Sequence, residues 1–271
     1  MRIIGRSDGK KVKGLPYFDL IVPHIMDKRY DASNVCNIDF DYAPIREYIV
    51  SKKAENIKLH FMPLLITAYL KTVKEKPEFN RFIMNKRIYM RNHICVSFVV
   101  LRDVEETVAK IYFEGDENVF EVQEKVEKAI GEARDSKNVN NVDKILSLIF
   151  SFGAIAGFVV GLIKFFDKRN WLPKFVIEAS PFHTSLFISN MASIRMTPVT
   201  HHLYEFGTTS VFAGVGAREK KVVLDRDGNV KEKHIVPIST TTDERICNGV
   251  VFAEGFALLK HFMKNPKLLE S

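Results

Sequence analysis

Residues 240 to 249 read Thr-Thr-Thr-Asp-Glu-Arg-Ile-Cys-Asn-Gly, a polar run that ends in a glycine. The apolar run that follows, Val250–Lys264, predicts a closing helix. Before it, Lys220–Ile238 predicts two strands joined at Asp227-Gly228, a pair typical of tight turns. The end of the chain is therefore expected to form a hairpin, a polar loop and a buried helix, in that order.

Two upstream segments complete a family pattern. Residues 185–190, Ser-Leu-Phe-Ile-Ser-Asn, and residues 76–80, Lys-Pro-Glu-Phe-Asn, resemble the T-F-T-I-S-N strand and the H-P-E-L-N segment of one family. Residues 240–249, with Asn265-Pro266-Lys267-Leu268-Leu269 after the helix, resemble its D-H-R-x-x-D-G signature and P-x-L-L ending. The family is the catalytic domain of the dihydrolipoamide acyltransferases of 2-oxoacid dehydrogenase complexes. Because order and approximate spacing are kept, the resemblance covers the whole chain except an insert at about 138–171.

The resemblance implies an α/β (α+β) fold similar to chloramphenicol acetyltransferase, a two-layer sandwich in which helices flank a mixed sheet. It further implies a homotrimer or a multiple of three, with the active site in a channel between subunits. Coenzyme A or acyl-coenzyme A would enter one end of the channel, and an acyl carrier or second substrate the other.

The resemblance also implies a site. In the family the motif histidine takes a proton from the attacking thiol, and the strand serine donates a hydrogen bond to the tetrahedral oxyanion. Ser189 stands at the serine position, whereas Glu244 replaces the histidine and Asn248 replaces the motif aspartate. These three residues are the candidate catalytic residues.

The change at Glu244 affects the chemistry directly. An exposed carboxylate is a weaker base than a thiolate by about four pKa units, which costs about 5 to 6 kcal/mol in driving force. Burial narrows that gap by raising a carboxylate pKa. Two interpretations stay open: a catalyst with a tuned glutamate, and a loop that survives only as a scaffold. His201 and His202 are an alternative, less favoured source of the base if Glu244 does not supply it.

Composition excludes several classes. The 271 residues are 46% hydrophobic and 27% charged, values of an ordinary globular protein rather than a disordered or coiled-coil one. Three cysteines without pair spacing provide no disulfide framework or four-ligand zinc site, so no metal is expected. The net charge of +7 is spread over short clusters, which argues against nucleic-acid binding. Basic residues near the start lead into no apolar segment, so a cytoplasmic protein is expected.

The rest of the chain predicts strands and helices without strict βαβ alternation, and hence a mixed sheet with helices on one side. The expected strands are 34–42, 93–101, 107–113, 175–178, 186–190 and 210–217, with a hairpin around Asn85-Lys86. The expected helices are 45–53, 59–74 and the amphipathic segment from Val119 to Ile130.

The insert contains 19 uncharged residues, Ile145–Ile163, followed by Lys164, Lys168 and Arg169. Three interpretations are open: a helix or hairpin buried in protein, a helix on or in a membrane surface, and a true membrane span. A span would place parts of one sheet on opposite sides of a bilayer, so we expect a helix sheltered by protein or by a membrane surface.

The leading hypothesis is a stand-alone acyltransferase of one domain, residues 1–271, acting on coenzyme A thioesters. We expect no lipoyl or subunit-binding domain, so a lipoyl group or other acyl carrier would come from a separate protein. The alternative is a non-catalytic trimeric scaffold or acyl-CoA-binding module.

Overall fold

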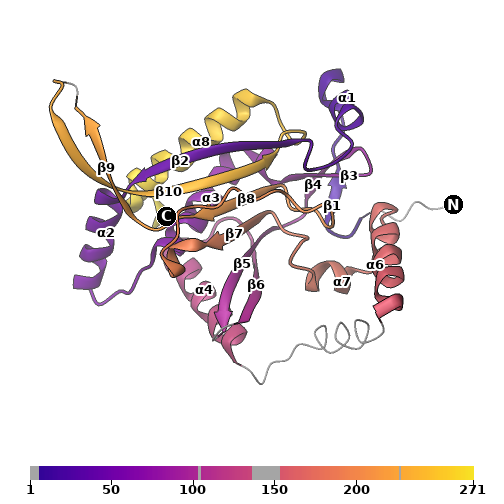
Figure 1. Cartoon of the computed structure of the whole chain (residues 1–271), viewed down its shortest axis with the longest axis horizontal. Helices are drawn as coiled ribbons and strands as arrows, with labels where there is room; N and C mark the ends of the chain where they lie inside the picture. Colours follow the sequence, from indigo (N-terminus) through magenta and orange to yellow (C-terminus); the bar gives the residue numbers. More distant parts are fainter. Residues whose placement is uncertain (1–5, 103–104, 136–152, 226) are drawn as a thin grey trace.

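The computed structural model describes residues 6–102, 105–135, 153–225 and 227–271. Its main sheet has seven strands in the order β2-β10-β8-β7-β5-β6, with β9 paired to β10 (Figure 1). The strands are β2 (Ser33–Asp41), β5 (Ile94–Arg102), β6 (Glu105–Phe113), β7 (Leu186–Asn190), β8 (Val211–Val215), β9 (Glu219–Leu224) and β10 (Val230–Asp243). Strand β7 runs parallel to β5 and β8, and the other pairs are antiparallel. The predicted mixed sheet is confirmed.

A smaller sheet, in the order β1-β4-β3, lies beside the main one (Figure 1). It consists of β1 (Gly9–Lys11), β3 (Arg81–Met84) and β4 (Arg87–Arg91). Asn85 and Lys86 connect β3 to β4 with φ of 48° and 58°. Two consecutive positive φ values are the conformation of a two-residue hairpin turn, so the predicted hairpin is confirmed.

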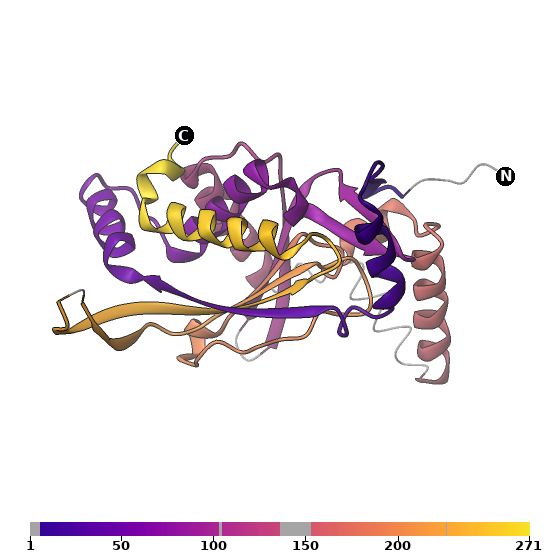
Figure 2. The ribbon, with the colours of Figure 1, turned by 90° about the horizontal axis from the view of Figure 1, so that it is seen from above.

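Helices cover one face of the main sheet (Figure 2). The described helices are α1 (Tyr17–Ile25), α2 (Tyr42–Ala54), α3 (Phe61–Glu75), α4 (Val119–Arg134), α6 (Gly153–Lys168), α7 (Lys174–Ala179) and α8 (Gly249–Lys264), with the 3₁₀ turns η1 (Pro77–Asn80), η2 (Met191–Ile194) and η3 (Pro266–Leu269). Helix α3 is buried over most of its surface because α8 and α4 flank it above the sheet. The two-layer architecture matches the predicted fold class.

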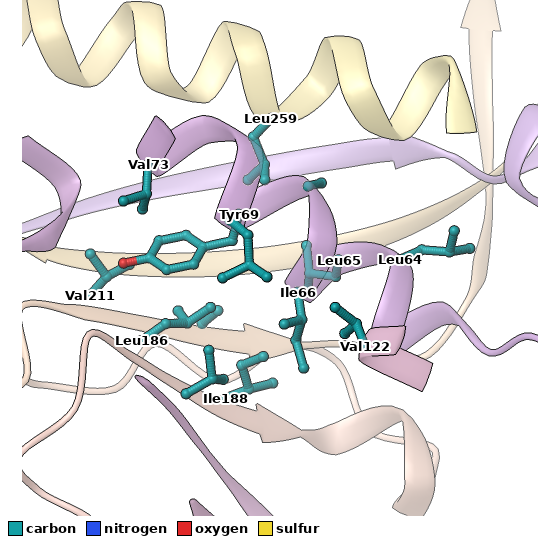
Figure 3. Packing of buried hydrophobic residues seen from close by; sticks show 14 of the residues in the cluster. Leu64, Leu65, Ile66, Tyr69, Val73, Val122, Leu186, Ile188, Val211 and Leu259 are labelled. Carbon is teal, nitrogen blue, oxygen red and sulfur yellow. The ribbon is translucent and has the colours of Figure 1, made fainter. Parts of the chain in front are cut away.

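The core lies between α3 and the central strands. In Figure 3, Leu65, Ile66 and Tyr69 of α3 point toward the sheet, where Leu186 and Ile188 of β7 lie. Val122 of α4 and Leu259 of α8 complete the cluster (Figure 3). All seven are buried apolar or aromatic residues whose removal from water drives the packing.

The Lys76–Asn80 segment, one of the three that carry the resemblance, joins α3 to α8. Phe79 of η1 packs edge-on against Phe252 and Phe256 of α8, with ring centroids 5.5 and 5.7 Å apart. A Cβ atom at Gly255 would lie 2.1 Å from the Phe79 ring, closer than side-chain atoms ever pack. The glycine in α8 therefore makes room for the phenylalanine that links the two helices.

One predicted strand is wrong. Residues Phe175–Glu178 lie in helix α7, which starts directly after Pro173. The apolar run Phe175–Ile177 is too short to distinguish a strand from a helix by periodicity, and the fixed φ of the proline favours a helix start. Lys110 of β6 donates hydrogen bonds to the carbonyl oxygens of Ile177 and Ser180 and so satisfies the end of α7.

The insert is partly described. Residues 138–152 lie outside the described residues, and 153–168 form α6, so the predicted helix over 145–163 is confirmed from residue 153 onward. Among the described residues, no helix has the length and hydrophobicity that a membrane crossing requires.

Two glycines in helices give a paired test of the packing at Phe79. Gly255→Ala should destabilise the protein by about 1 to 3 kcal/mol, because the added methyl group overpacks the α3–α8 contact. The control is Gly131→Ala in α4, where nothing lies within 4 Å of an added Cβ. That change should stabilise the protein by about 0.5 to 1 kcal/mol through helix propensity. Urea unfolding at one fixed protein concentration measures both, and equal effects at the two sites would contradict the packing argument.

Candidate functional site

The loop after β10 is held by a buried ion pair between Asp243 and Arg245. Asp243 is fully buried, and each of its carboxylate oxygens accepts a hydrogen bond of 2.8 Å from the Arg245 guanidinium, one from Nε and one from Nη2. The backbone N–H of Arg245 also donates to Asp243 Oδ1 at 3.2 Å. This two-pronged pairing fixes the residues on both sides of Glu244.

Arg29 extends this charge cluster to other parts of the chain. Its Nε lies 3.5 Å from Asp243 Oδ2, and its remaining nitrogens donate to the carbonyl oxygens of Ile83, Tyr204 and Gly207. Burial lowers the pKa of Arg29, and the negative charge of Asp243 opposes that shift. We call Arg29, Asp243 and Arg245 the buried charge cluster.

Glu244 lies between the two members of that ion pair but takes no part in it. Its backbone N–H donates to the carbonyl oxygen of Ala32 at 2.9 Å, which fixes its Cα. Its carboxylate makes no hydrogen bond or ion pair with any described residue, and the side chain is partly exposed. Glu244 therefore has a fixed backbone, and its carboxylate remains available to a group outside the described chain.

Asn248 has a structural partner. It is the exposed N-cap of α8, and its side-chain oxygen accepts a hydrogen bond of 3.0 Å from the backbone N–H of Val251. Such caps satisfy an N–H group that the helix itself leaves without a partner. The sequence motif alone did not distinguish this capping role from a catalytic one.

Ser189 lies in β7, next to Gly214 of β8. It is half-buried, and its hydroxyl donates to Met191 Sδ at 3.3 Å, a weak hydrogen bond that a better acceptor would replace. Among the described residues, the hydroxyl has no other hydrogen-bond partner, so it can donate to a bound group once it leaves Met191.

The sheet register separates Ser189 from Glu244. Ser189 pairs with Gly214, which pairs with Ser239 of β10, so Ser189 lies two strands away from Ser239 in one row. Glu244 follows five residues later along the chain, which corresponds to about 17 Å of strand in addition to the two-strand offset. The structure does not bring the predicted site residues together within one chain.

The two histidines considered as an alternative base belong to an aromatic cluster. His201 stacks on Phe212 at a ring-centroid distance of 4.4 Å and on His202 at 4.7 Å. Phe212 pairs with Thr241, three residues before Glu244, so about 10 Å of strand separates that row from the loop. Neither histidine side chain contacts Glu244 in the described chain.

A large groove opens near Ser189, at the ends of β7 and β8. It has a volume of about 1000 Å³, and an adjoining cavity of about 160 Å³ contains Ser189 and shares Met62, Ile130, Arg134 and Asn190 with it. Five basic side chains from separate segments line the groove: Lys58, His60, Arg134, Arg195 and Arg218. Glu127 is its one acidic lining residue and lies 3.5 Å from Lys58. The groove, with its apolar floor and basic rim, suits a long anionic ligand.

At Gly214 and Gly216, beside this groove, neighbouring atoms leave no room for a side chain. A Cβ atom at Gly214 would lie 2.5 Å from the carbonyl oxygen of Val199, and one at Gly216 would lie 2.4 Å from Pro198. The segment around Pro198 and Val199 therefore passes directly over the end of β8. Spacing alone could not have indicated this role.

Cys95 is a buried thiol with a lowered pKa, which sequence reasoning did not single out. Although burial raises its pKa, a hydrogen bond with His93 and the charges of Arg91 and Lys110 lower it to about 6. The thiol is fully buried and donates to the carbonyl oxygen of His183 at 3.5 Å, so no substrate reaches it in this structure. The described residues also contain no cluster of three or more side chains suited to a metal ion.

Asn248 provides a test that separates capping from catalysis. Asn248→Ala should lower the unfolding free energy by about 1 kcal/mol, because α8 loses its cap. Asn248→Asp keeps an acceptor oxygen and should retain the stability of the wild type. Urea unfolding measures both variants, and an unchanged stability of Asn248→Ala would contradict the capping role.

Comparisons with known proteins agree with the predicted resemblance. Residues 183–270 match the family model for the 2-oxoacid dehydrogenases acyltransferase (catalytic domain). The chain is 23% identical over 250 residues to the dihydrolipoyllysine-residue acetyltransferase component of the pyruvate dehydrogenase complex of Rickettsia prowazekii (strain Madrid E). That match covers 92% of this chain and 50% of the relative, so the chain spans about half the length of the curated relative.

Two solved structures share the fold. The dihydrolipoamide acetyltransferase of Azotobacter vinelandii has a TM-score of 0.63 at 15% identity, with 96% of this chain and 94% of that chain covered. A chloramphenicol acetyltransferase has a TM-score of 0.55 at 10% identity, with 94% and 99% covered. The predicted resemblance and the predicted fold class are both confirmed.

Proposed function

We propose that this protein transfers acyl groups to or from coenzyme A thioesters, at sites completed between subunits by Ser189 of one chain and Glu244 of another. The observation that carries the proposal is the placement of Glu244. The buried charge cluster fixes its backbone where the family motif has its histidine, and its carboxylate is free to act on a substrate. The matched region, residues 183–270, includes both Ser189 and Glu244.

The Azotobacter enzyme supports the choice of Asn248 as a candidate catalytic residue. Its catalytic mechanism has been examined through a serine, a histidine and an asparagine, the last two being four residues apart. Glu244 and Asn248 have the same spacing. At the three corresponding positions, this chain has a serine and an asparagine like that enzyme. Only the histidine differs, because Glu244 stands in its place.

Glu244 and Ser189 each have one role in the proposed reaction. The Glu244 carboxylate takes the proton from the attacking thiol, and the new C–S bond turns the thioester carbonyl into an oxyanion. Ser189 donates its hydroxyl to that oxyanion in place of Met191 Sδ. When the carbonyl re-forms, the C–S bond to coenzyme A breaks and the departing sulfur takes the proton from Glu244.

A neighbouring subunit would also change the basicity at this position. A carboxylate that is covered by protein loses water, and burial raises a carboxylate pKa toward that of the thiol. Enclosure between subunits would therefore supply the tuning that a solvent-exposed glutamate lacks. The reaction needs the assembly for its chemistry as well as for its geometry.

The assembly we propose is a homotrimer or a multiple of three, formed by a single domain with an insert at about 138–171. The separation of Ser189 and Glu244 within the chain supports a shared site. The basic groove would hold the phosphates of the thioester, with its acyl end toward Ser189. The second substrate would be a thiol on a separate lipoyl or acyl-carrier protein.

The site test combines two inactive variants. Ser189→Ala and Glu244→Gln should each lower acyl transfer by about 10²-fold or more, because each loses a group that stabilises the transition state. When the two variants are co-expressed in equal amounts, each mixed trimer has one intact site out of three, and about a quarter of all sites in the population should contain both intact residues, so activity should return to about a quarter of the wild type. Absence of recovery in mixed trimers would contradict the shared site.

Glu244→His belongs to the same experiment. It restores the family residue and should be at least as active as the wild type, since imidazole is the better matched base. Coenzyme A-dependent turnover of several thioesters measures all variants. If the wild type and Glu244→His both bind acetyl-coenzyme A without turning it over, the protein is an acyl-CoA-binding module and the catalytic proposal is wrong.

The groove gives a separate prediction about affinity. The triple change Arg134→Gln, Arg195→Gln and Arg218→Gln should weaken coenzyme A binding by about tenfold or more, because three cations that face the phosphates are lost. Titration calorimetry at low and high salt measures the effect, which should shrink as salt rises. The triple change Lys10→Gln, Lys11→Gln and Lys13→Gln, at exposed positions in and just after β1, removes the same number of charges and should bind normally. Equal weakening in both proteins would locate the phosphates elsewhere.

A further inference from the structure

Helix α6 presents an exposed apolar face that no described part of the chain covers. Phe158 is 71% exposed, and Leu162 and Phe165 are also exposed. Their spacing of four and three residues places them along one side of the helix. Trp171, which follows the helix, lies edge-on to Phe165 and extends this apolar surface.

The opposite side of α6 is fixed to the core through Asp167. Its carboxylate accepts a hydrogen bond of 2.9 Å from Arg6 Nη1 and lies 3.2 Å from His183 Nε2, and all three side chains are buried. Although burial raises the pKa of Asp167, the hydrogen bond with His183 and the charges of His183 and Arg6 lower it overall. The ionised Asp167 therefore holds α6 in place with its apolar face outward.

The charges around the apolar face have one sign. Between residues 153 and 174, Asp167 is the single acidic residue, and it is buried. Lys164, Lys168, Arg169 and Lys174 are exposed in the same stretch, and the Arg169 guanidinium lies 3.6 Å from the centre of the Phe165 ring. Cations beside exposed aromatic and aliphatic side chains match the headgroup region of an anionic bilayer. The same cations would repel those of a second copy brought face to face.

We propose that the apolar face of α6, with Trp171, binds the surface of bilayers that contain anionic lipids. The helix lies along the membrane and does not cross it. The exposed apolar side chains Phe158, Leu162 and Phe165 lie along one side of the helix, as in helices that lie in the plane of a membrane surface. Asp167 keeps it joined to the sheet domain, so binding brings the whole protein to the membrane with α6 as the point of contact.

The position of α6 in the molecule allows a matched control. Helix α6 and the β9–β10 hairpin lie at opposite ends of the molecule in both views (Figures 1 and 2). Val222 and Leu224 of β9 are 65% and 70% exposed, similar to the side chains of the α6 face. Changes in β9 therefore remove exposed apolar surface without altering the proposed contact.

The test is flotation of the full-length protein with vesicles. The wild type should float with vesicles of phosphatidylcholine mixed with phosphatidylserine and much less with phosphatidylcholine alone, and high salt should release it. Phe158→Asp with Leu162→Asp should lower binding by about tenfold or more, because two apolar anchors are lost. Lys164→Gln with Lys168→Gln should lower it by about fivefold for each cation.

The control variant, Val222→Asp with Leu224→Asp, should float like the wild type. Circular dichroism establishes that every variant is folded. The proposal is wrong if the wild type does not float with the mixed vesicles, or if the α6 variants float as well as the control. If the wild type fails to float and light scattering shows that the α6 variants dissociate into smaller species, the face is a contact between copies of the chain and the lipid proposal is overturned.

Discussion

The geometry of the candidate site depends on the buried charge cluster of Arg29, Asp243 and Arg245. Asp243 ends β10, and Arg245 reaches the carbonyl oxygen of Met26, ahead of β2. Arg29 joins the same carboxylate to carbonyl oxygens in β3 and in the loop before β8. Removing one partner from such a cluster leaves a buried charge without compensation and typically costs about 3 to 5 kcal/mol. The cluster thus connects four segments that hydrophobic packing alone would leave free to shift.

Much of this fold could be predicted from the sequence because its elements have distinct patterns. The alternation in β2, the apolar periodicity of α4 and the Asn85-Lys86 turn each gave a clear signal. Helix α7 gave none, since a run of three apolar residues fits either structure. Helix α1 was not predicted, and its exposed Tyr17 and Phe18 are not the surface of an amphipathic helix packed on a core.

The candidate site was predicted less completely, for a physical reason. The motif identified Ser189, Glu244 and Asn248, but only the strand register shows that Ser189 and Glu244 lie toward opposite ends of β7 and β10, two strands that β8 separates. The hydrogen bond from the Val251 N–H to Asn248 is likewise a property of the folded helix terminus. Residue types indicate which chemistry is available, whereas the register decides which groups can meet.

The structure also explains how a glutamate can occupy the histidine position without disturbing the loop. The fixed contacts of residue 244 are its backbone N–H to Ala32 and its neighbours' ion pair, and none of them uses its side chain. The loop would keep its shape with either residue because the energy that holds it resides in Asp243 and Arg245. In the proposed site, a glutamate instead of the histidine of the resembled family therefore changes the proton chemistry at this position while leaving the geometry intact. A loop that served only as a scaffold would need the Asp243–Arg245 ion pair but not the free carboxylate of Glu244. A catalytic loop would need both, so changes of the side chain at position 244 distinguish the two roles.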